Sequence, residues 1–246
     1  MILNSAATRC VSYHCGITIR STGLSKARQR PQSAHLKAES QVRIIAGRWR
    51  GRQLKFPVVS NLRPTGNRIR ETLFNWLQPI VAGSRCLDLF AGSGALGFEA
   101  GSRGAAHVTL VESHIDAVAA LKENQQALTS SDGGGDGGGD EETDAELSVI
   151  HGEALAWLSQ HQHAQNKDAQ NKHAHTFDIV FLDPPFAMTG IDELAAALES
   201  SRLLAEECWI YLESSALQAV PRLPGNWHCH REKTAGEVCY RLYRRG

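Results

Sequence analysis

The chain has 246 residues, enough for one main domain with additions, and 42% of them are apolar, a share sufficient for a buried core. No apolar run approaches the roughly 20 residues that span a bilayer, which argues against an integral membrane protein. The 26 basic and 26 acidic residues balance, but residues 132–146 hold seven of the acids and no base, so the rest of the chain has 26 basic residues against 19 acidic ones and predicts a polyanionic partner.

Residues 1–40 contain six Arg or Lys, one acid and no periodic apolar pattern. This composition is typical of a disordered basic tail. An organelle transit peptide has a similar composition, and so has a segment read from a start codon placed too far upstream, so both remain alternatives.

A basic segment follows at 41–80, with eight Arg or Lys and a single acid. Residues 42–56 predict two short strands around a glycine-containing turn. Trp49 lies among the basic residues, and basic plus aromatic side chains on a hairpin are typical of RNA binding, while a solvated charged face is the plainer alternative. Three arginines at alternate positions would form one row on a strand face: Arg48, Arg50 and Arg52.

A turn at 62–66 precedes an expected helix of about 12 residues that begins at Asn67. Its apolar residues recur at helical spacing and would pack on a core: Ile69, Leu73, Trp76 and Leu77. Arg68 and Arg70 lie near its N-terminal end, where they oppose the helix dipole unless an anion is near. We therefore expect this end to face a ligand, although Glu71 could offset the two charges.

From residue 85 onward, apolar strand patterns alternate with helix patterns. Strands are expected at 85–90, 106–112, 147–151, 177–183 and 207–213, and helices at 94–103, 114–129, 153–160 and 190–202. Repeated βα units predict an α/β fold with a doubly wound, mostly parallel sheet. Two last strands at 226–233 and 237–244 predict a C-terminal hairpin that adds an antiparallel strand.

Two stretches interrupt this pattern without belonging to the core. Residues 129–146 are rich in Gly and Asp, and residues 160–175 repeat Ala-Gln-Asn-Lys and hold four histidines. We interpret both as polar loops, the second in preference to a metal site built from paired His-x-His. The expected organisation is a tail at 1–40, an RNA-binding hairpin and helix at 41–80, and the main domain at 81–246.

The central motif is CLDLFAGSGALGFEA, a strand that ends in Asp88, a glycine turn and a helix start. At Gly92, Ser93 and Gly94 a ligand can lie against bare backbone and meet the first N–H groups of the helix. The next strand ends at Glu112, and a carboxylate there can accept both hydroxyl hydrogens of a ribose. A tight strand–helix turn in any α/β protein is the plainer alternative.

The fourth strand ends in Asp183-Pro184-Pro185-Phe186. Two prolines would fix the backbone so that Asp183 and the Pro184 carbonyl face the cleft, and Phe186 would offer a flat face to a base. Two acceptors beside an aromatic ring suit an exocyclic amine, which has two N–H donors. A proline-stiffened turn with no chemical role is the alternative.

These motifs together resemble class I S-adenosylmethionine-dependent methyltransferases that modify amino groups of bases. The chain is more closely similar to the bacterial 16S ribosomal RNA guanine-N2 methyltransferase family over residues 42–244, apart from the two polar loops. The segments that carry this resemblance are RIIAGRWRGRQL, LRPTGNRIRETLFNWL, DLFAGSGALGFEA, LDPPF and KTAGEVCYRLY. It departs from the family at Gly66-Asn67, usually more polar or acidic, and at Glu153, where Asp is commoner.

The resemblance implies a seven-stranded Rossmann-like sheet, S-adenosylmethionine as cofactor and a guanine of 16S rRNA, the 966 site, as substrate. Asp88 and the glycine turn would hold the methionine portion, Glu112 the ribose, and Glu153 or the Ala154 backbone the adenine. Asp183, Pro184 and Phe186 would hold the guanine, with Asp183 mainly positioning the amine and stabilising charge. The residues expected to contact RNA are Arg48, Arg50, Arg52, Arg63, Arg68 and Arg70. No metal is expected.

The resemblance also implies a monomer that acts on an assembling small ribosomal subunit in the bacterial cytoplasm, with no membrane partner. Six cysteines without a C-x-x-C pair favour free thiols in a reducing compartment. Organelle targeting by residues 1–40 is a minority alternative.

Other functions remain open at this point. Gly92, Gly94 and Gly97 with Glu112 also fit the fingerprint of a nicotinamide-dependent oxidoreductase, which would leave the Asp-Pro-Pro-Phe motif unexplained. Within methyltransferases, adenine N6 in DNA or RNA is an alternative target. A catalytically silent RNA-binding factor on the same fold is a third possibility, for which missing cofactor residues would be the signature.

Overall fold

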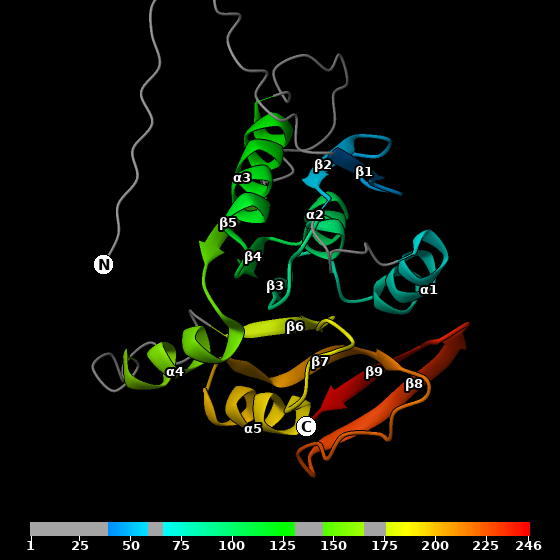
Figure 1. Ribbon diagram of the computed structural model, residues 1–246, viewed down its shortest axis with the longest axis vertical. Helices are drawn as coiled ribbons and strands as arrows, with labels where there is room; N and C mark the ends of the chain where they lie inside the picture. Colours follow the sequence, from blue (N-terminus) through cyan, green and yellow to red (C-terminus); the bar gives the residue numbers. More distant parts are fainter. Residues whose placement is uncertain (1–38, 59–65, 131–144, 165–175) are drawn as a thin grey trace, which may run out of the picture. The chain divides into compact units, whose positions relative to one another are not determined.

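The structure, a computed structural model, describes residues 39–58, 66–130, 145–164 and 176–246 (Figure 1). The expected tail at 1–40 lies almost wholly outside this range, as do Arg63 and most of the two polar loops. Residues 37–246 form one compact unit, so the basic segment at 41–80 belongs to the same unit as the main domain. None of the helices within the described ranges is both long and apolar enough to cross a bilayer.

A seven-stranded sheet organises this unit, with the strand order β5-β4-β3-β6-β7-β9-β8. Neighbouring strands from β5 to β7 pair in parallel, and β9 runs antiparallel to both β7 and β8. The predicted doubly wound sheet with its C-terminal hairpin is confirmed. Its strands are β3 (Arg85–Asp88), β4 (His107–Glu112), β5 (Glu146–His151), β6 (Phe177–Leu182), β7 (Leu204–Ser215), β8 (Trp227–Ala235) and β9 (Val238–Arg245).

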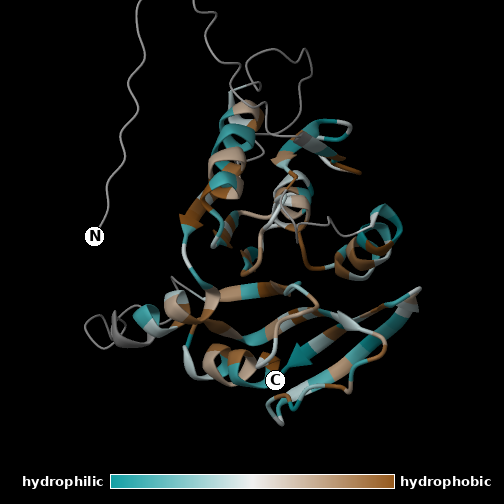
Figure 2. Ribbon diagram, viewed as in Figure 1, coloured by the Kyte–Doolittle hydropathy of each residue, from teal (hydrophilic) through white to brown (hydrophobic). Residues whose placement is uncertain are grey.

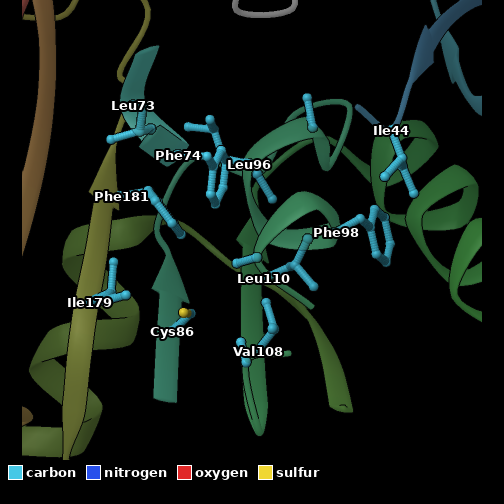
Figure 3. Close-up of a cluster of buried hydrophobic side chains, with 14 of the residues drawn as sticks. Ile44, Leu73, Phe74, Cys86, Leu96, Phe98, Val108, Leu110, Ile179 and Phe181 are labelled. Atoms are coloured by element: carbon cyan, nitrogen blue, oxygen red, sulfur yellow. The ribbon is translucent and has the colours of Figure 1, made fainter. Parts of the chain in front are cut away.

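Five helices of the described chain cover the two faces of this sheet: α1 (Asn67–Leu77), α2 (Ala95–Ser102), α3 (Ile115–Thr129), α4 (Ala154–Ala164) and α5 (Ile191–Ser200). Because successive side chains of a strand point to opposite faces, Cys86 and Ile179 join one core, whereas Leu87 and Val180 join the other. The first core packs against α1, α2 and α3, and the second against α4 and α5 (Figure 3). Polar residues lie mainly on the outer faces of the helices (Figure 2).

The basic segment forms the expected hairpin, but its strands are short. Strand β1 (Glu39–Arg43) pairs with β2 (Gln53–Pro57), so Arg48 and Arg50 lie in the connecting turn and Arg52 just before β2. The prediction that these arginines share one strand face is therefore wrong. Trp49 is also buried, with 2% of its surface exposed, because it packs into the first core instead of standing free for a base.

Helix α1 begins at Asn67 as predicted, but Arg70 does not face solvent. Its side chain is fully buried, 3.5 Å from Glu99 of α2, and donates to the Arg43 carbonyl at 3.0 Å. Glu99 also accepts the backbone N–H groups of Ile45 and Ala46 at 2.7 and 3.0 Å. The anion expected near this end of α1 is thus internal. The expectation that Arg70 contacts RNA is wrong, since it joins the hairpin to α1 and α2.

Candidate active site

The predicted site lies at the carboxyl edge of the sheet, where the strand order reverses between β3 and β6. Beyond β3, the N–H of Leu89 donates to the carbonyl of Phe181 at 3.2 Å, and the N–H of Ala91 donates to that of Val111 at 3.0 Å. The chain after β3 therefore enters the glycine turn between the ends of β6 and β4. This crevice is where doubly wound sheets bind ligands.

Asp88 is a buried carboxyl group with one unpartnered oxygen. Its Oδ2 accepts the N–H of Gly97 in the first turn of α2 at 3.2 Å, whereas its Oδ1 is buried without a hydrogen bond in the described residues. Burial, then the negative charge of Asp183, raises the pKa of Asp88 to about 7. A cation placed here would relieve both costs, so the site fits the ammonium of an amino-acid ligand.

The glycine turn depends on backbone conformations that other residues rarely adopt. Gly94 caps α2 with φ +77°, and a Cβ atom on it would lie 2.4 Å from the ring of Phe98. Gly92 also has a positive φ, of 52°, and Ser93 between them is buried. Both glycines are therefore required by the backbone, whatever the ligand.

Glu112 at the end of β4 holds the turn from the other side. Its Oε2 accepts the N–H of Gly92 at 2.8 Å, and its Oε1 accepts the N–H of His114 at 2.7 Å. The N–H of Gly92, which precedes α2, is therefore donated to this carboxylate within the protein. Each carboxylate oxygen keeps a further lone pair, and two oxygens oriented in this way suit a pair of ribose hydroxyls.

The turn after β5 lies next to Glu112. The N–H of Gly152 donates to the Glu112 carbonyl at 2.9 Å, and the His151 ring contacts the Ser113 carbonyl at 3.0 Å. Ala154 is buried at the start of α4, whereas Glu153 is exposed. Of the two predicted adenine contacts, the Ala154 backbone is the better enclosed.

Residues 183–186 leave β6 at the same edge. Asp183 is half-buried, Pro184 is buried and Phe186 is 46% exposed, an unusual exposure for a large apolar ring. The Phe186 carbonyl accepts the side-chain amide of Gln218 at 3.3 Å, which ties this corner to the chain after β7. After burial, the negative charge of Asp183 is the second cause that raises the pKa of Asp88, so the two carboxyl groups lie near enough to interact.

One acidic residue beside this corner was missed from the sequence. Strand β7 continues beyond its last pair with β6, Leu182 opposite Leu212, so Glu213 lies beside Asp183. Glu213 is only 3% exposed and accepts the hydroxyl of Tyr211 at 2.6 Å. Burial, then the charge of Glu213, raises the pKa of Tyr211. A glutamate within the apolar run CWIYLESS was the available signal.

The structure separates the predicted RNA-binding residues. Arg48 donates its backbone N–H to the Ser102 carbonyl at the end of α2, and Arg52 donates its side chain to the Ala127 carbonyl near the end of α3. Helices α2 and α3 start at the carboxyl edge of the sheet and run away from it, so this turn lies at the opposite edge from Asp88. The exposed Arg68 lies in the first turn of α1, whose Phe74 packs 6.0 Å between ring centroids from Phe181, the residue opposite Asp88, so α1 lies near the active-site edge.

Comparison with known proteins identifies the family of this chain. Residues 42–137 and 141–244 match the family model described as "Conserved hypothetical protein 95". The chain is 42% identical to the ribosomal RNA small subunit methyltransferase D of Escherichia coli K12 over 83% of this chain and 90% of that protein. The Haemophilus influenzae protein of the same name is 41% identical, over 84% and 95%. A solved structure described as "Putative methyltransferase yhhF" from Escherichia coli has a TM-score of 0.67 and 42% identity, and the match covers 84% of this chain and 98% of that one.

Proposed function

The chain belongs to the family described as conserved hypothetical protein 95, and on that premise we propose that it methylates the exocyclic N2 amine of a guanine in 16S rRNA, at position 966. The activity as a methyltransferase of small-subunit rRNA follows the relatives' name. The choice of guanine N2 rests on residues 183–186, whose two acceptors and exposed ring suit an amine on a flat base.

S-adenosylmethionine is the cofactor that these residues fit, and it supplies a methyl group already activated by its sulfonium charge. The unpartnered Oδ1 of Asp88 would accept the ammonium of its methionine portion. Glu112 would accept the ribose hydroxyls, since the Gly92 and His114 N–H groups fix its orientation. The Ala154 backbone, with Glu153 beside it, would border the adenine.

The protein's own part in the reaction is to align the amine and to stabilise its developing charge. The N2 lone pair of guanine is delocalised into the ring, which makes it a poor nucleophile. Hydrogen bonds from the amine to the Asp183 carboxylate and the Pro184 carbonyl would favour a more pyramidal nitrogen and stabilise positive charge on it. Phe186, which is partly exposed, would stack on the base, and the base must leave its own stack to reach this corner.

The juxtaposition of Asp88 and Asp183 carries this proposal. Burial, then repulsion from the Asp183 carboxylate, raises the pKa of Asp88, so an ionised Asp88 is costly in the free protein. A cationic cofactor next to Asp88 and an amine next to Asp183 would convert that repulsion into attraction for both reactants.

Transfer of a labelled methyl group to 16S rRNA tests the proposal. Naked rRNA and partly assembled small subunits are offered in parallel, both from cells that lack this activity. We expect label in 16S rRNA, with subunits the better substrate if the protein acts during assembly. Label that enters DNA or no nucleic acid at all would overturn the assignment.

A further inference from the structure

A row of paired residues leads across the sheet from the active site to the edge strand β8. Leu182 of β6 lies opposite Leu212 of β7, so Asp183 and Glu213 are the next residues of this row. Glu213 lies opposite Tyr240 of β9, and Tyr240 lies opposite Lys233 of β8. Three spacings between neighbouring strands separate Asp183 from Lys233, a distance of about 14 Å.

Lys233 and Arg231 point to the face of the sheet that α1 covers. Tyr240 and Leu242, with which they pair, belong to the core on that face, and Trp76 of α1 stacks on Tyr240 with ring centroids 5.6 Å apart. Both cations are exposed beyond the helix. Strand β8 is an edge strand of the sheet, exposed over most of its length, and shows mainly hydrophilic colours in Figure 2.

Arg231 and Lys233 make no ion pair in the part of the chain that the structure describes. Glu232 between them points to the other face, where it pairs with Arg241. Two exposed acids border the region, Glu71 on α1 and Glu237 in the β8–β9 turn.

Helix α1 contributes a third cation at the active-site end. Arg68 is exposed and precedes Thr72 and Trp76 at intervals of four residues, on the side of α1 that turns toward β9. We call Arg68, Arg231 and Lys233 the basic strip. Lys233 ends the row that begins at Asp183, and Arg231 lies two residues before it on the same strand; all three cations of the strip are exposed.

We propose that the basic strip binds the phosphate backbone of the RNA next to the target nucleotide, along the exposed side of β8. This inference rests on the proposed function and deepens it, since it assigns the substrate a path across the protein. Lysine and arginine without acid partners are the residues that neutralise phosphates. Lys233 lies about 14 Å from Asp183, a length that a few nucleotides of RNA can span. The Arg48–Arg52 turn lies at the opposite edge of the sheet and can contact only RNA farther from the target nucleotide.

Charge reversal on β8 tests the proposal. The variant Arg231→Glu/Lys233→Glu is compared with Lys122→Glu/Arg202→Glu, which changes the net charge equally on exposed residues of α3 and of the turn after α5. The dissociation constant for a 16S rRNA fragment is measured between 50 and 300 mM salt. Affinity for S-adenosylhomocysteine serves as the check that each variant is folded.

The β8 variant is expected to bind RNA at least about tenfold more weakly at low salt, with a salt slope reduced by about 1.5 for two lost phosphate contacts. The control variant should lose no more than about twofold, with an unchanged slope. Wild-type affinity in the β8 variant, or an equal loss in the control, would overturn the proposal. The proposed function fails separately, if the wild-type protein binds this RNA but transfers no methyl group to it.

Discussion

The buried carboxyl group of Asp88 predicts that cofactor affinity depends on pH. Its pKa is raised to about 7 by burial and by the charge of Asp183, so the group is largely protonated in the free protein at pH 6. A ligand ammonium binds best to the ionised form. We therefore expect the affinity for the cofactor to be highest well above pH 7 and to be lost as the pH falls through 7.

The size of the effect follows from the ionised fraction of the free protein. With a pKa of about 7, that fraction falls from about nine tenths at pH 8 to about one tenth at pH 6, and the dissociation constant rises about tenfold if the complex holds Asp88 ionised. This corresponds to about 1.4 kcal/mol. Binding should then release about 0.9 proton at pH 6 and about 0.1 proton at pH 8.

Calorimetry with S-adenosylhomocysteine in buffers of different ionisation enthalpy measures both quantities. The variant Asp88→Asn keeps an acceptor for the Gly97 N–H but cannot titrate, so it reports any contribution from the ligand's own amino group. 5′-Methylthioadenosine lacks the amino-acid portion and should bind with no dependence on Asp88. An affinity of the wild-type protein that is unchanged between pH 6 and pH 8, or an equal change in the variant, would refute the reasoning.

The remaining predictions concern stability and transfer. Asp88→Asn should raise the free energy of unfolding of the ligand-free protein at pH 8 by about 2–4 kcal/mol, measured by urea unfolding. The pKa of Asp88 in the folded protein is above the ordinary 3.8, so ionisation of this carboxyl group destabilises the folded protein as the pH rises toward 7, and the neutral asparagine avoids that loss. Asp183→Asn should slow methyl transfer at least about 100-fold while cofactor affinity stays within about threefold, and near-normal turnover would contradict its role. Arg70→Ala should cost about 3–5 kcal/mol in urea unfolding, because it leaves Glu99 buried with one cation fewer, whereas Arg68→Ala should cost less than about 0.5 kcal/mol; equal losses would argue against the burial of Arg70.

The sheet could be predicted because its signals are local and repeated. Each apolar run of four to six residues ended at a glycine, proline or acid, and each predicted strand and helix lies within a few residues of its observed bounds. The hairpin after Gly225 was equally readable, from two polar–apolar strands around Ala235-Gly236. Strand order and register depend on contacts far apart in the chain, so these local signals could not supply them. The observed order agrees with the resemblance to Rossmann-like methyltransferases.

The arginines show what the sequence could not supply. Arg48, Arg50, Arg52, Arg68 and Arg70 look alike in a basic segment, yet they lie in different places. One is fully buried, two lie in a turn, one lies just before β2, and one lies exposed in the first turn of α1. The positions of the hairpin turn and of Arg70 depend on contacts with Glu99 and Ser102, which come about 30 to 55 residues later in the chain. The alternation of arginines wrongly predicted a strand face. These distant partners set the length of the turn between β1 and β2, and the local sequence does not show them.

The site residues were predicted because they follow strand ends, where the topology gathers them. Asp88, Glu112 and Asp183 each end or follow a parallel strand, and the structure brings them to one edge. Glu213 was missed since β7 continues past its neighbour, an extension of one strand that only pairing reveals.

The identity of the methylated nucleoside tests the central claim most directly. Digestion of 16S rRNA after reaction with this protein, followed by mass spectrometry, distinguishes a methyl group on the exocyclic amine from one on the ring. The account predicts N2-methylguanosine at a single position, produced by the wild-type protein and absent with Asp183→Asn. N6-methyladenosine or a ring-methylated base, or an unchanged yield from the variant, would contradict it.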